Sequence, residues 1–424
     1  MGLVSPLGQG VEENWTRLRD LKTGISQQRR DDLPACFCYA GTVAPLASPS
    51  VPASLAAQVK FLNRGAVLGL TAAYEAMAQG RAGAQVVPAA SRALFIASGD
   101  FSKIGYEFLY PATEEEAASG RWPPNYERIN DRAVAGVYPF FLLESISNNL
   151  FSLLSASYDF HGPNTSLASL SPYGSQALEL AYRAIQSGTA DAALAVGYGH
   201  WTGAIPIYEL EGLGLLSRCE HGARSFRPFD RSRDGFIPGE GGAAIFLELS
   251  ELAKKRGGSV LARIRGCGNC IELSEAGGMG VPSRVTLRSM RAALADADCS
   301  GKDLAFILGH GSGTQKGDRS ELVSVLELTE AESVRIPVCG LKAYTGHMGA
   351  ASDIAEVIFG IKSAESRIAP ATLHFERAEK EFAHLAISEK HQPASGNCFL
   401  SVSYGLGGQS SAIIVSANRS QLGR

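Results

Sequence analysis

Long apolar runs, basic clusters and closely paired cysteines are scarce or absent in this sequence, and each absence excludes a class of protein. No stretch of about 18 apolar residues occurs, so no transmembrane helix is expected. The opening residues MGLVSPLGQG lack the charged, apolar and small-residue sections of a signal peptide. Lysines and arginines form no run, aromatic residues do not alternate with them, and the formal net charge is −3, so a nucleic-acid partner is not expected.

The cysteines are too sparse to hold the chain together. Eight of them are scattered over 424 residues, which is not the density of a disulfide-stapled secreted domain, and a reducing cytoplasm is the expected location. Cys267 and Cys270 form a CGNC pair, but no second pair and no nearby histidine completes a tetrahedral metal site. We interpret this spacing as chance at a strand end and expect no metal.

The remaining composition is typical of a large globular protein. With 45% hydrophobic and 19% charged residues, the chain can bury a large core, and its length suggests more than one folding unit. Apolar strand-like runs alternate with amphipathic helical stretches, which predicts an α/β protein with buried, substantially parallel sheets. Strands are expected at residues 93–98, 192–196, 243–249, 305–308, 399–402 and 412–415, and helices at residues 62–78, 175–186, 287–297, 321–328 and 354–364.

The chain divides most naturally into two halves. Residues 251–258 are charged and end in glycine, which predicts a joint between a half at residues 1–250 and a half at residues 251–424. SLASLSPYGSQALELAYRAI in the first half and CGLKAYTGHMGAASDIAEVI in the second both read as a strand, a polar glycine-bearing turn and a helix. This similarity is what a duplicated βαβ-type domain would leave behind.

One long segment reads as irregular. Residues 110–138 are polar and rich in glycine and proline. We expect a surface excursion there that covers or borders a pocket.

Four separated segments carry polar side chains in glycine-rich contexts, where the backbone can approach a ligand closely. They are HGPNTSLASLSPYGSQAL, RPFDRSRDGFIPGEGGAAIFLE, LGHGSGTQKGDRSE with CGLKAYTGHMGAA, and SVSYGLGGQSSA. In order and spacing they resemble the β-ketoacyl synthase (ketosynthase) family of thiolase-fold condensing enzymes over almost the whole chain.

The resemblance depends on five matches in one order. GLVSPLGQGVEENWTRLRDLKTGI resembles the family's first strand exit and helix, although the strand that normally precedes it is absent, which leaves a truncated or misassigned start open. RPFDRSRDGFIPGEGGA resembles the most recognisable internal signature. GHGSGTQKGD resembles the segment with the first active-site histidine, LKAYTGHMGAA the segment with the active-site lysine and the second histidine, and SYGLGGQS the glycine-rich closing loop.

The resemblance implies a thiolase-like fold of five layers, αβαβα, with two similar halves whose central helices meet at the active site. It implies a reaction in which a nucleophile holds an acyl chain as a thioester, and a malonyl-type extender loses carbon dioxide and attacks that thioester. His310 and His347 fall on the histidine positions and would donate hydrogen bonds to the extender's thioester oxygen. Lys342 falls on the lysine position, and Glu321 on that of a structural acid that could hold Lys342.

The resemblance also assigns the surroundings of these groups. Ser312 and Thr314 fall on hydroxyl positions that contact the phosphopantetheine arm, although simple turn chemistry also explains them. Leu406 falls where many members have a gating phenylalanine, and its backbone N–H would complete an oxyanion hole with that of Ser171. No bound cofactor is implied, because the substrates are carried on the phosphopantetheine of acyl carrier protein.

Ser171 departs from the family, since it stands where the nucleophilic cysteine belongs. A helix N-terminus at this position would lower the pKa of a thiol, but a hydroxyl needs an adjacent general base. The sequence also permits a purely structural role, with Ser171 as the helix N-cap and Pro172 in the first helical position. A cysteine restored at position 171 is expected to restore acylation if the rest of the site is intact.

Several functions stay open. The chain is a chain-length-factor-like partner of a cysteine-bearing ketosynthase, a Ser171-dependent acyltransferase or slow condensing enzyme, an engineered Cys→Ser form of an active ketosynthase, or, from another class, a non-catalytic acyl-binding protein. Chain-length factors usually lose the histidines as well as the cysteine, and this chain keeps His310 and His347. Pro172 and Tyr173 count against an engineered form, since a trap would change one residue only.

The resemblance implies macromolecular partners. Family members dimerise through the strand that leads to the nucleophile, here residues 166–170, which predicts a homodimer or a heterodimer with a cysteine-bearing ketosynthase. Acyl carrier protein is the other expected partner. Its acidic surface would contact basic residues near the tunnel mouth, with Arg218 and Arg64 as candidates.

Overall fold

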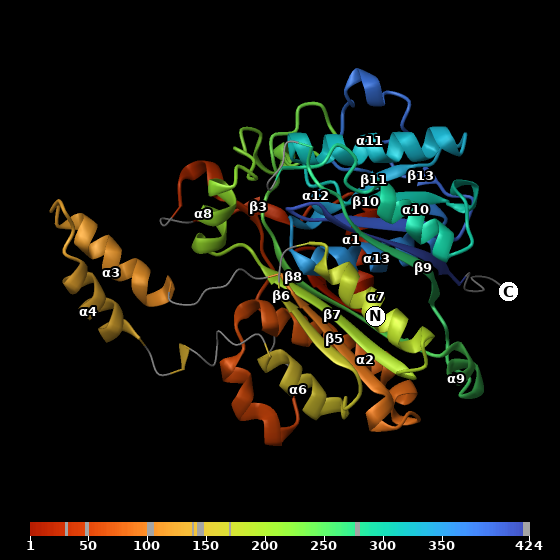
Figure 1. Ribbon diagram of the computed structural model, residues 1–424, viewed down its shortest axis with the longest axis horizontal. Coiled ribbons are helices and arrows are strands. Elements are labelled where there is room, and N and C mark those ends of the chain that lie inside the picture. Colours follow the sequence, from red (N-terminus) through yellow and green to blue (C-terminus); the bar gives the residue numbers. More distant parts are fainter. Residues whose placement is uncertain are drawn as a thin grey trace.

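Two large β-sheets organise the computed structural model, which describes residues 1–29, 33–46, 51–99, 106–137, 140–141, 148–168, 171–275 and 280–418 (Figure 1). The first sheet has the order β2-β1-β8-β7-β5-β6 and the second the order β11-β10-β14-β15-β9. The strands of the first sheet are β1 (Gly2–Ser5), β2 (Gly8–Gln9), β5 (Arg92–Ser98), β6 (Asn164–Ala168), β7 (Ala192–His200) and β8 (Glu240–Glu248). Those of the second are β9 (Ala262–Ile271), β10 (Phe306–Gly309), β11 (Val338–Gly340), β14 (Cys398–Tyr404) and β15 (Gln409–Ala417).

The two sheets repeat one topology. In the first, β6, β5 and β7 run parallel, and β8 and then β1 follow antiparallel. In the second, β11, β10 and β14 run parallel, and β15 and then β9 follow antiparallel. The similarity between the two strand–turn–helix stretches in the sequence therefore reflects two similar halves, as expected. The division into domains at residue 250 stays a prediction.

Helices separate and cover the sheets (Figure 1). The helices α7 (Tyr173–Gln186) and α13 (Ala350–Glu365) lie between the sheets, where α13 contacts β7 and β8 on one side and β14 and β15 on the other. The helix α2 (Arg64–Gln85) covers the outer face of the first sheet together with α6 (Asn149–Tyr158), and α10 (Leu287–Asp296) covers the second sheet and packs against α11 (Gln315–Ala331). The expected αβαβα layering is confirmed.

Burial explains why the sequence pattern identified these elements. The first eight residues of β7, AALAVGYG, are all buried, because helices pack on both faces of the sheet. All six expected strands and all five expected helices overlap observed elements. Further helices are α1 (Val11–Arg19), α8 (Ala204–Gly212), α9 (Ser250–Lys255) and α12 (Lys342–Thr345), and further small strands are β3 (Ile25–Gln27), β4 (Tyr39–Gly41), β12 (Ile368–Ala369) and β13 (Gln392–Pro393).

The expectation of an irregular segment at residues 110–138 is wrong. The segment contains most of α3 (Tyr106–Ala118) and all of α4 (Tyr126–Gly136), which project from the body as a helical pair (Figure 1), while Tyr138 lies outside the described residues. The prolines at positions 123 and 124 fall in the turn between the helices rather than within them. Asn125 caps α4 by accepting a hydrogen bond from the backbone N–H of Arg128, a start signal that the sequence contains.

Further findings concern metal binding and membrane-spanning helices. Cys267 and Cys270 lie on β9 at an odd spacing, so their side chains leave opposite faces of the strand and do not converge on one ion. Within the described ranges, no group of three or more histidine, cysteine or acidic residues could hold a metal ion. The same part of the chain has no helix both long and apolar enough to cross a membrane.

Candidate active site

One cavity collects the residues that the sequence singled out. It has a volume of about 70 Å³ and lies where the N-terminus of α7, the end of β10, the loop before α13 and the loop between β14 and β15 meet. Its predicted site residues are Ser171, His310, Ser312, Thr314, His347 and Leu406. Segments from both halves of the chain therefore build the site, and apolar side chains such as Trp201, Leu210 and Phe236 line the rest of its wall.

His347 is held in a defined orientation directly after α12. Its ring stacks on Trp201 at a centroid distance of 4.6 Å and contacts Phe236 at 4.9 Å. Its Nδ1 accepts a hydrogen bond of 3.2 Å from the backbone N–H of Gly349, so the proton of the neutral ring belongs on Nε2. Burial, and then the charge of Lys342, lower the pKa of His347 well below its ordinary value. The ring is therefore a neutral donor at physiological pH.

His310 faces His347 across the site. The two ring centroids are 5.2 Å apart, and the His310 ring also packs at 4.4 Å against Tyr404. Burial, Lys342 and His347, in that order, lower the pKa of His310 well below its ordinary value. Its buried Nδ1 has no hydrogen-bond partner among the residues that the structure describes. Two neutral imidazoles that share one cavity can both donate to an oxygen on which negative charge develops.

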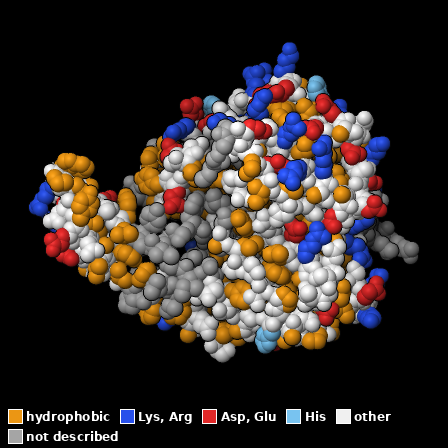
Figure 2. Space-filling view, in the orientation of Figure 1, with side chains coloured by type: hydrophobic (Ala, Val, Ile, Leu, Met, Phe, Trp, Pro, Cys, Tyr) orange, Lys and Arg blue, Asp and Glu red, His pale blue; other side chains and the backbone are white. Residues whose placement is uncertain are grey.

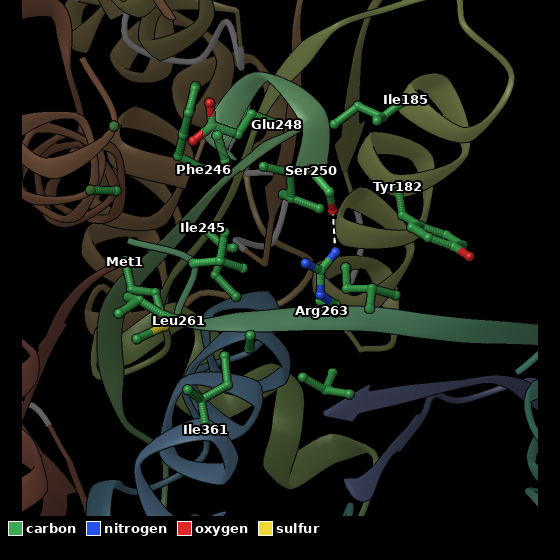
Figure 3. Close-up of a pocket in the computed structure, with 18 of the residues that line it drawn as sticks. Met1, Tyr182, Ile185, Ile245, Phe246, Glu248, Ser250, Leu261, Arg263 and Ile361 are labelled. Atoms are coloured by element: carbon green, nitrogen blue, oxygen red, sulfur yellow. Dashed lines mark hydrogen bonds between the residues drawn. The ribbon is translucent and has the colours of Figure 1, made fainter. Parts of the chain in front are cut away.

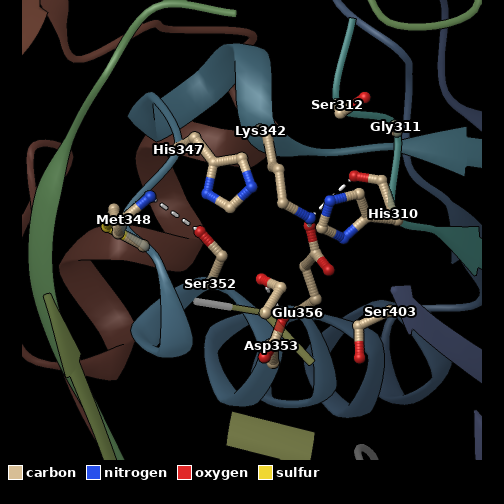
Figure 4. Close-up of polar contacts among 12 residues, drawn as sticks. His310, Gly311, Ser312, Lys342, His347, Met348, Ser352, Asp353, Glu356 and Ser403 are labelled. Atoms are coloured by element: carbon tan, nitrogen blue, oxygen red, sulfur yellow. Dashed lines mark hydrogen bonds and ion pairs between the residues drawn. The ribbon is translucent and has the colours of Figure 1, made fainter. Parts of the chain in front are cut away.

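Lys342 binds the backbone of His310 and a buried carboxylate (Figure 4). Its Nζ donates to the carbonyl oxygen of His310 at 2.7 Å and to Oε1 of Glu356 at 2.8 Å, and both side chains of this ion pair are almost fully buried. Glu356 was not identified from the sequence. The available signal was a carboxylate on a helix whose neighbouring positions are apolar, since such a buried charge requires a partner.

Glu321 has a different role from the one expected. Its carboxylate accepts the backbone N–H groups of His310 at 2.6 Å and of Gly311 at 3.0 Å, so it fixes the loop that carries the histidine and does not pair with Lys342. Burial, and then the charge of Asp318, raise the pKa of Glu321 to about 8. The pairing Lys342–Glu321 is therefore corrected to Lys342–Glu356.

Removal of the Glu356 carboxylate tests the importance of the buried pair. Glu356→Ala leaves the ammonium group of Lys342 buried without its counter-ion, and we expect a loss of about 3–5 kcal/mol in the free energy of unfolding. Urea unfolding followed by circular dichroism measures it. Glu251→Ala, which removes an exposed i,i+3 pair with Lys254, is the matched control and should cost less than about 1 kcal/mol. Equal losses in the two variants would contradict the assignment.

Ser171 is not the helix cap that the sequence suggested. The helix α7 starts at Tyr173 with Pro172 as its N-cap, and no side chain of that segment makes a capping bond. The Ser171 hydroxyl instead donates to Oδ1 of Asp353 at 3.0 Å. The backbone N–H of Gly174 donates to Oδ2 of Asp353 at 3.1 Å. A carboxylate from α13, rather than the Ser171 side chain, therefore accepts one of the N–H groups that have no partner within the first turn of α7.

The loop between β14 and β15 packs directly on Ser171. A Cβ atom added to Gly405 would lie 1.9 Å from the carbonyl oxygen of Ser171, so only glycine permits this approach. The neighbouring Leu406 therefore reaches the cavity beside Ser171. The oxyanion hole formed by the two backbone N–H groups stays a prediction.

The two hydroxyl groups assigned to the phosphopantetheine arm also bind one another. Ser312 Oγ lies 2.8 Å from Thr314 Oγ1, donates to Asp318 at 3.0 Å and lies 3.2 Å from the Tyr404 hydroxyl. Both residues line the cavity, which is where the predicted contact requires them. A structural role in the turn before α11 accounts for the same bonds.

The two arginines proposed for carrier-protein docking have different environments. Arg64 binds the nearly buried carboxylate of Glu240 through Nη2 at 2.7 Å and the carbonyl of Val43 at 3.0 Å, so its guanidinium has a structural task. Arg218 has a 58% exposed side chain and pairs with Glu211 at 3.0 Å. The geometry therefore favours Arg218 over Arg64 as a docking residue.

A larger cavity, of about 690 Å³, lies elsewhere in the molecule (Figure 3). Its lining comes from the last part of β8, the first part of β9 and the flanks of α7 and α13, with Ile245, Leu261 and Ile361 pointing into it. Arg263 binds Ser250 at its edge. None of the predicted site residues borders this space, so size alone does not identify the reaction centre.

Comparisons with known proteins agree with the geometry. Residues 1–253 match the model of the β-ketoacyl synthase N-terminal domain, and residues 261–376 match that of the C-terminal domain. The 3-oxoacyl-[acyl-carrier-protein] synthase 2 of Coxiella burnetii is 25% identical over 98% of this chain and 97% of its own.

Two solved structures share the fold over nearly their full length. A type II polyketide ketosynthase in complex with its acyl carrier protein aligns with a TM-score of 0.78 at 23% identity, covering 98% of this chain and 97% of that one. The ishigamide ketosynthase/chain length factor aligns with a TM-score of 0.80 at 20% identity, with the same coverage of 98% and 97%.

Proposed function

Because the chain belongs to the β-ketoacyl synthase family, we propose that it handles acyl chains on acyl carrier protein as a chain-length-factor-like partner of a cysteine-bearing ketosynthase. The observation that carries this proposal is that the hydroxyl of Ser171, which the resemblance assigns to the nucleophile position, binds a buried carboxylate rather than a histidine. The names of the Coxiella burnetii relative and of the ishigamide structure support the carrier-protein and chain-length-factor parts of the proposal.

The cavity supports a role other than storage of a long acyl chain. Its volume of about 70 Å³ is well below the roughly 300–1,000 Å³ of ordinary ligand pockets. The retained His310 and His347 still offer two neutral donors to a small thioester. We therefore propose that the chain keeps the ability to polarise an extender thioester, while the growing chain is attached to the partner's cysteine.

The exposed surface of the first half supports dimerisation. β6 is at the edge of its sheet, so one side of its backbone has no strand partner within the described residues. Figure 2 shows hydrophobic side chains gathered on the projecting α3–α4 pair, where Trp122 is 90%, Tyr126 72% and Val134 65% exposed. An apolar projection and an open sheet edge each fit burial against a second subunit. Ser169 and Leu170 of the proposed dimer strand lie outside the described residues.

A charge on the projecting pair should weaken the dimer. Val134→Asp places a carboxylate on the apolar surface of α4, and we expect the dimer's dissociation constant to rise at least about 10-fold. Sedimentation equilibrium with the co-expressed ketosynthase measures it. Val86→Asp makes the same change at a 59% exposed position directly after α2, outside the projecting pair, and should leave assembly unchanged. If both variants assemble like the parent, this surface is not part of the interface.

One observation favours a second candidate function, acyl transfer through Ser171. Asp353 accepts a hydrogen bond from the hydroxyl at 3.0 Å, so an adjacent base is present that the sequence did not reveal. Burial raises the pKa of Asp353 to about 6, but a carboxylate with that pKa is still a weak base for a hydroxyl, and its other oxygen is occupied by the backbone N–H of Gly174. We therefore rank acyl transfer below the partner role.

A further inference from the structure

The acceptor of the Ser171 hydroxyl is a buried carboxylate, that of Asp353. Asp353 lies in the first turn of α13 and is fully buried. One of its oxygens accepts from Ser171, and the other accepts from Gly174. The two residues are 182 positions apart in the sequence, so the pairing exists only in the folded chain.

We propose that Asp353 is a second determinant, beside Ser171, that prevents the nucleophile position from carrying a thiolate. The inference deepens the proposed function and rests on its assignment of position 171 as the nucleophile position. A cysteine at this position places its sulfur at hydrogen-bond distance from a buried carboxylate. Substitution of Ser171 alone therefore does not recover a reactive thiol, in contrast to the expectation from the sequence.

Two opposing effects act on a thiol at position 171. The N-terminus of α7 stabilises a thiolate and lowers the thiol's pKa by about 1. A carboxylate about 4 Å away repels the thiolate and, at an effective dielectric constant of about 20, raises that pKa by about 3. The repulsion is the larger effect, so the thiol stays protonated near neutral pH.

The other charges around Asp353 do not reverse this result. Lys342 is the cation that acts on Asp353, but its ammonium group is already paired with Glu356 at 2.8 Å. His310 and His347 are neutral, because burial lowers their pKa values. The carboxylate of Glu321 is occupied by backbone N–H groups.

Proton sharing between the two groups favours the same state. Burial, partly opposed by Lys342, raises the pKa of Asp353 to about 6, whereas an ordinary thiol has a pKa of about 8.5. The pair therefore loses its first proton from Asp353, and the second must leave a thiol beside a charge. At neutral pH the negative charge is on the carboxylate and the proton is on sulfur.

The pH dependence of alkylation tests the inference. Ser171→Cys and Ser171→Cys/Asp353→Asn are treated with iodoacetamide over a range of pH, and modification at position 171 is followed by peptide mass spectrometry, which separates it from the eight native cysteines. We expect a thiol pKa above about 8.5 with Asp353 present, and alkylation at neutral pH at least about 10-fold faster with asparagine. Ser171→Cys/Glu365→Gln makes the same chemical change at the far end of α13 and should react like Ser171→Cys.

Two results would overturn the inference. A thiol pKa below about 7 in Ser171→Cys would overturn it. Because this measurement leaves Asp353 unchanged, it remains decisive even if the asparagine variant does not fold. Equal alkylation rates in the folded single and double variants would also do so. Because no partner subunit is needed, these outcomes are independent of whether the chain acts as a chain-length-factor-like partner.

Discussion

His310→Ala and His347→Ala will each slow the release of carbon dioxide from malonyl-acyl carrier protein by at least about 100-fold, with or without the partner subunit. Each substitution removes one of two neutral imidazoles, whose centroids are 5.2 Å apart in one cavity. Negative charge develops on the extender's thioester oxygen as carbon dioxide leaves, so donors that are fixed in place lower that barrier. Release of labelled carbon dioxide is the direct measurement.

His384→Ala is the control for this prediction, because His384 is exposed and lies outside the cavity. It should decarboxylate at the parent rate. If His310→Ala and His347→Ala also do so, the assignment of the pair to decarboxylation is wrong. If only one of the two variants lost decarboxylation activity, only that histidine would take part in the reaction.

The decarboxylation rate should have a simple pH profile. Burial lowers the pKa values of both histidines well below 6.5, so both rings stay neutral as the pH rises from 6.5 and the rate should not change there. As the pH falls through the lowered pKa values, the rings gain protons in a buried site and the neutral arrangement is lost. If the rate fell by half as the pH rose from slightly acidic to neutral, the assignment of both histidines as neutral hydrogen-bond donors would be wrong.

Product formation by the assembled pair will depend on the partner's cysteine and not on Ser171. We expect Ser171→Ala, combined with the ketosynthase, to retain most of the parent rate, because the proposed function assigns condensation to the partner's cysteine and not to position 171. Replacement of the partner's cysteine by alanine should reduce condensation by about 1,000-fold or more. Chromatography of the products measures both. A large loss in Ser171→Ala, with the cavity still folded, would favour the acyltransfer alternative.

The site residues were predicted from the family resemblance, which short, glycine-rich motifs carry. His310 and His347 lie next to glycines that let the backbone turn into the cavity, Gly311 and Gly346, with positive φ angles of 51° and 76°. Such turns depend on the residue types at neighbouring positions, so they can be predicted from a single sequence. The alternation of strand-like and helical stretches predicted an α/β fold with buried sheets for the same reason, whereas the five layers were predicted from the resemblance.

The partners of these residues could not be predicted in the same way. Glu356 and Asp353 both come from α13, and each acts on a group in another segment through a contact that only the tertiary structure creates. The Ser171 cap was a local inference that a distant carboxylate replaced. Nothing in the sequence around Arg64 indicates that it forms an ion pair with Glu240. Residue types indicated the chemistry, but contacts between distant segments decided the pairings.

Intact-protein mass spectrometry after incubation with acyl-carrier-protein thioesters tests the central claim most directly. We expect this chain to stay unmodified while the cysteine-bearing partner gains one acyl group, because the Ser171 hydroxyl donates to a carboxylate, which is a weak base for a hydroxyl, rather than to a histidine. A stoichiometric acyl adduct that maps to Ser171, and that is lost in Ser171→Ala, would contradict it and show Ser171 to be a working nucleophile.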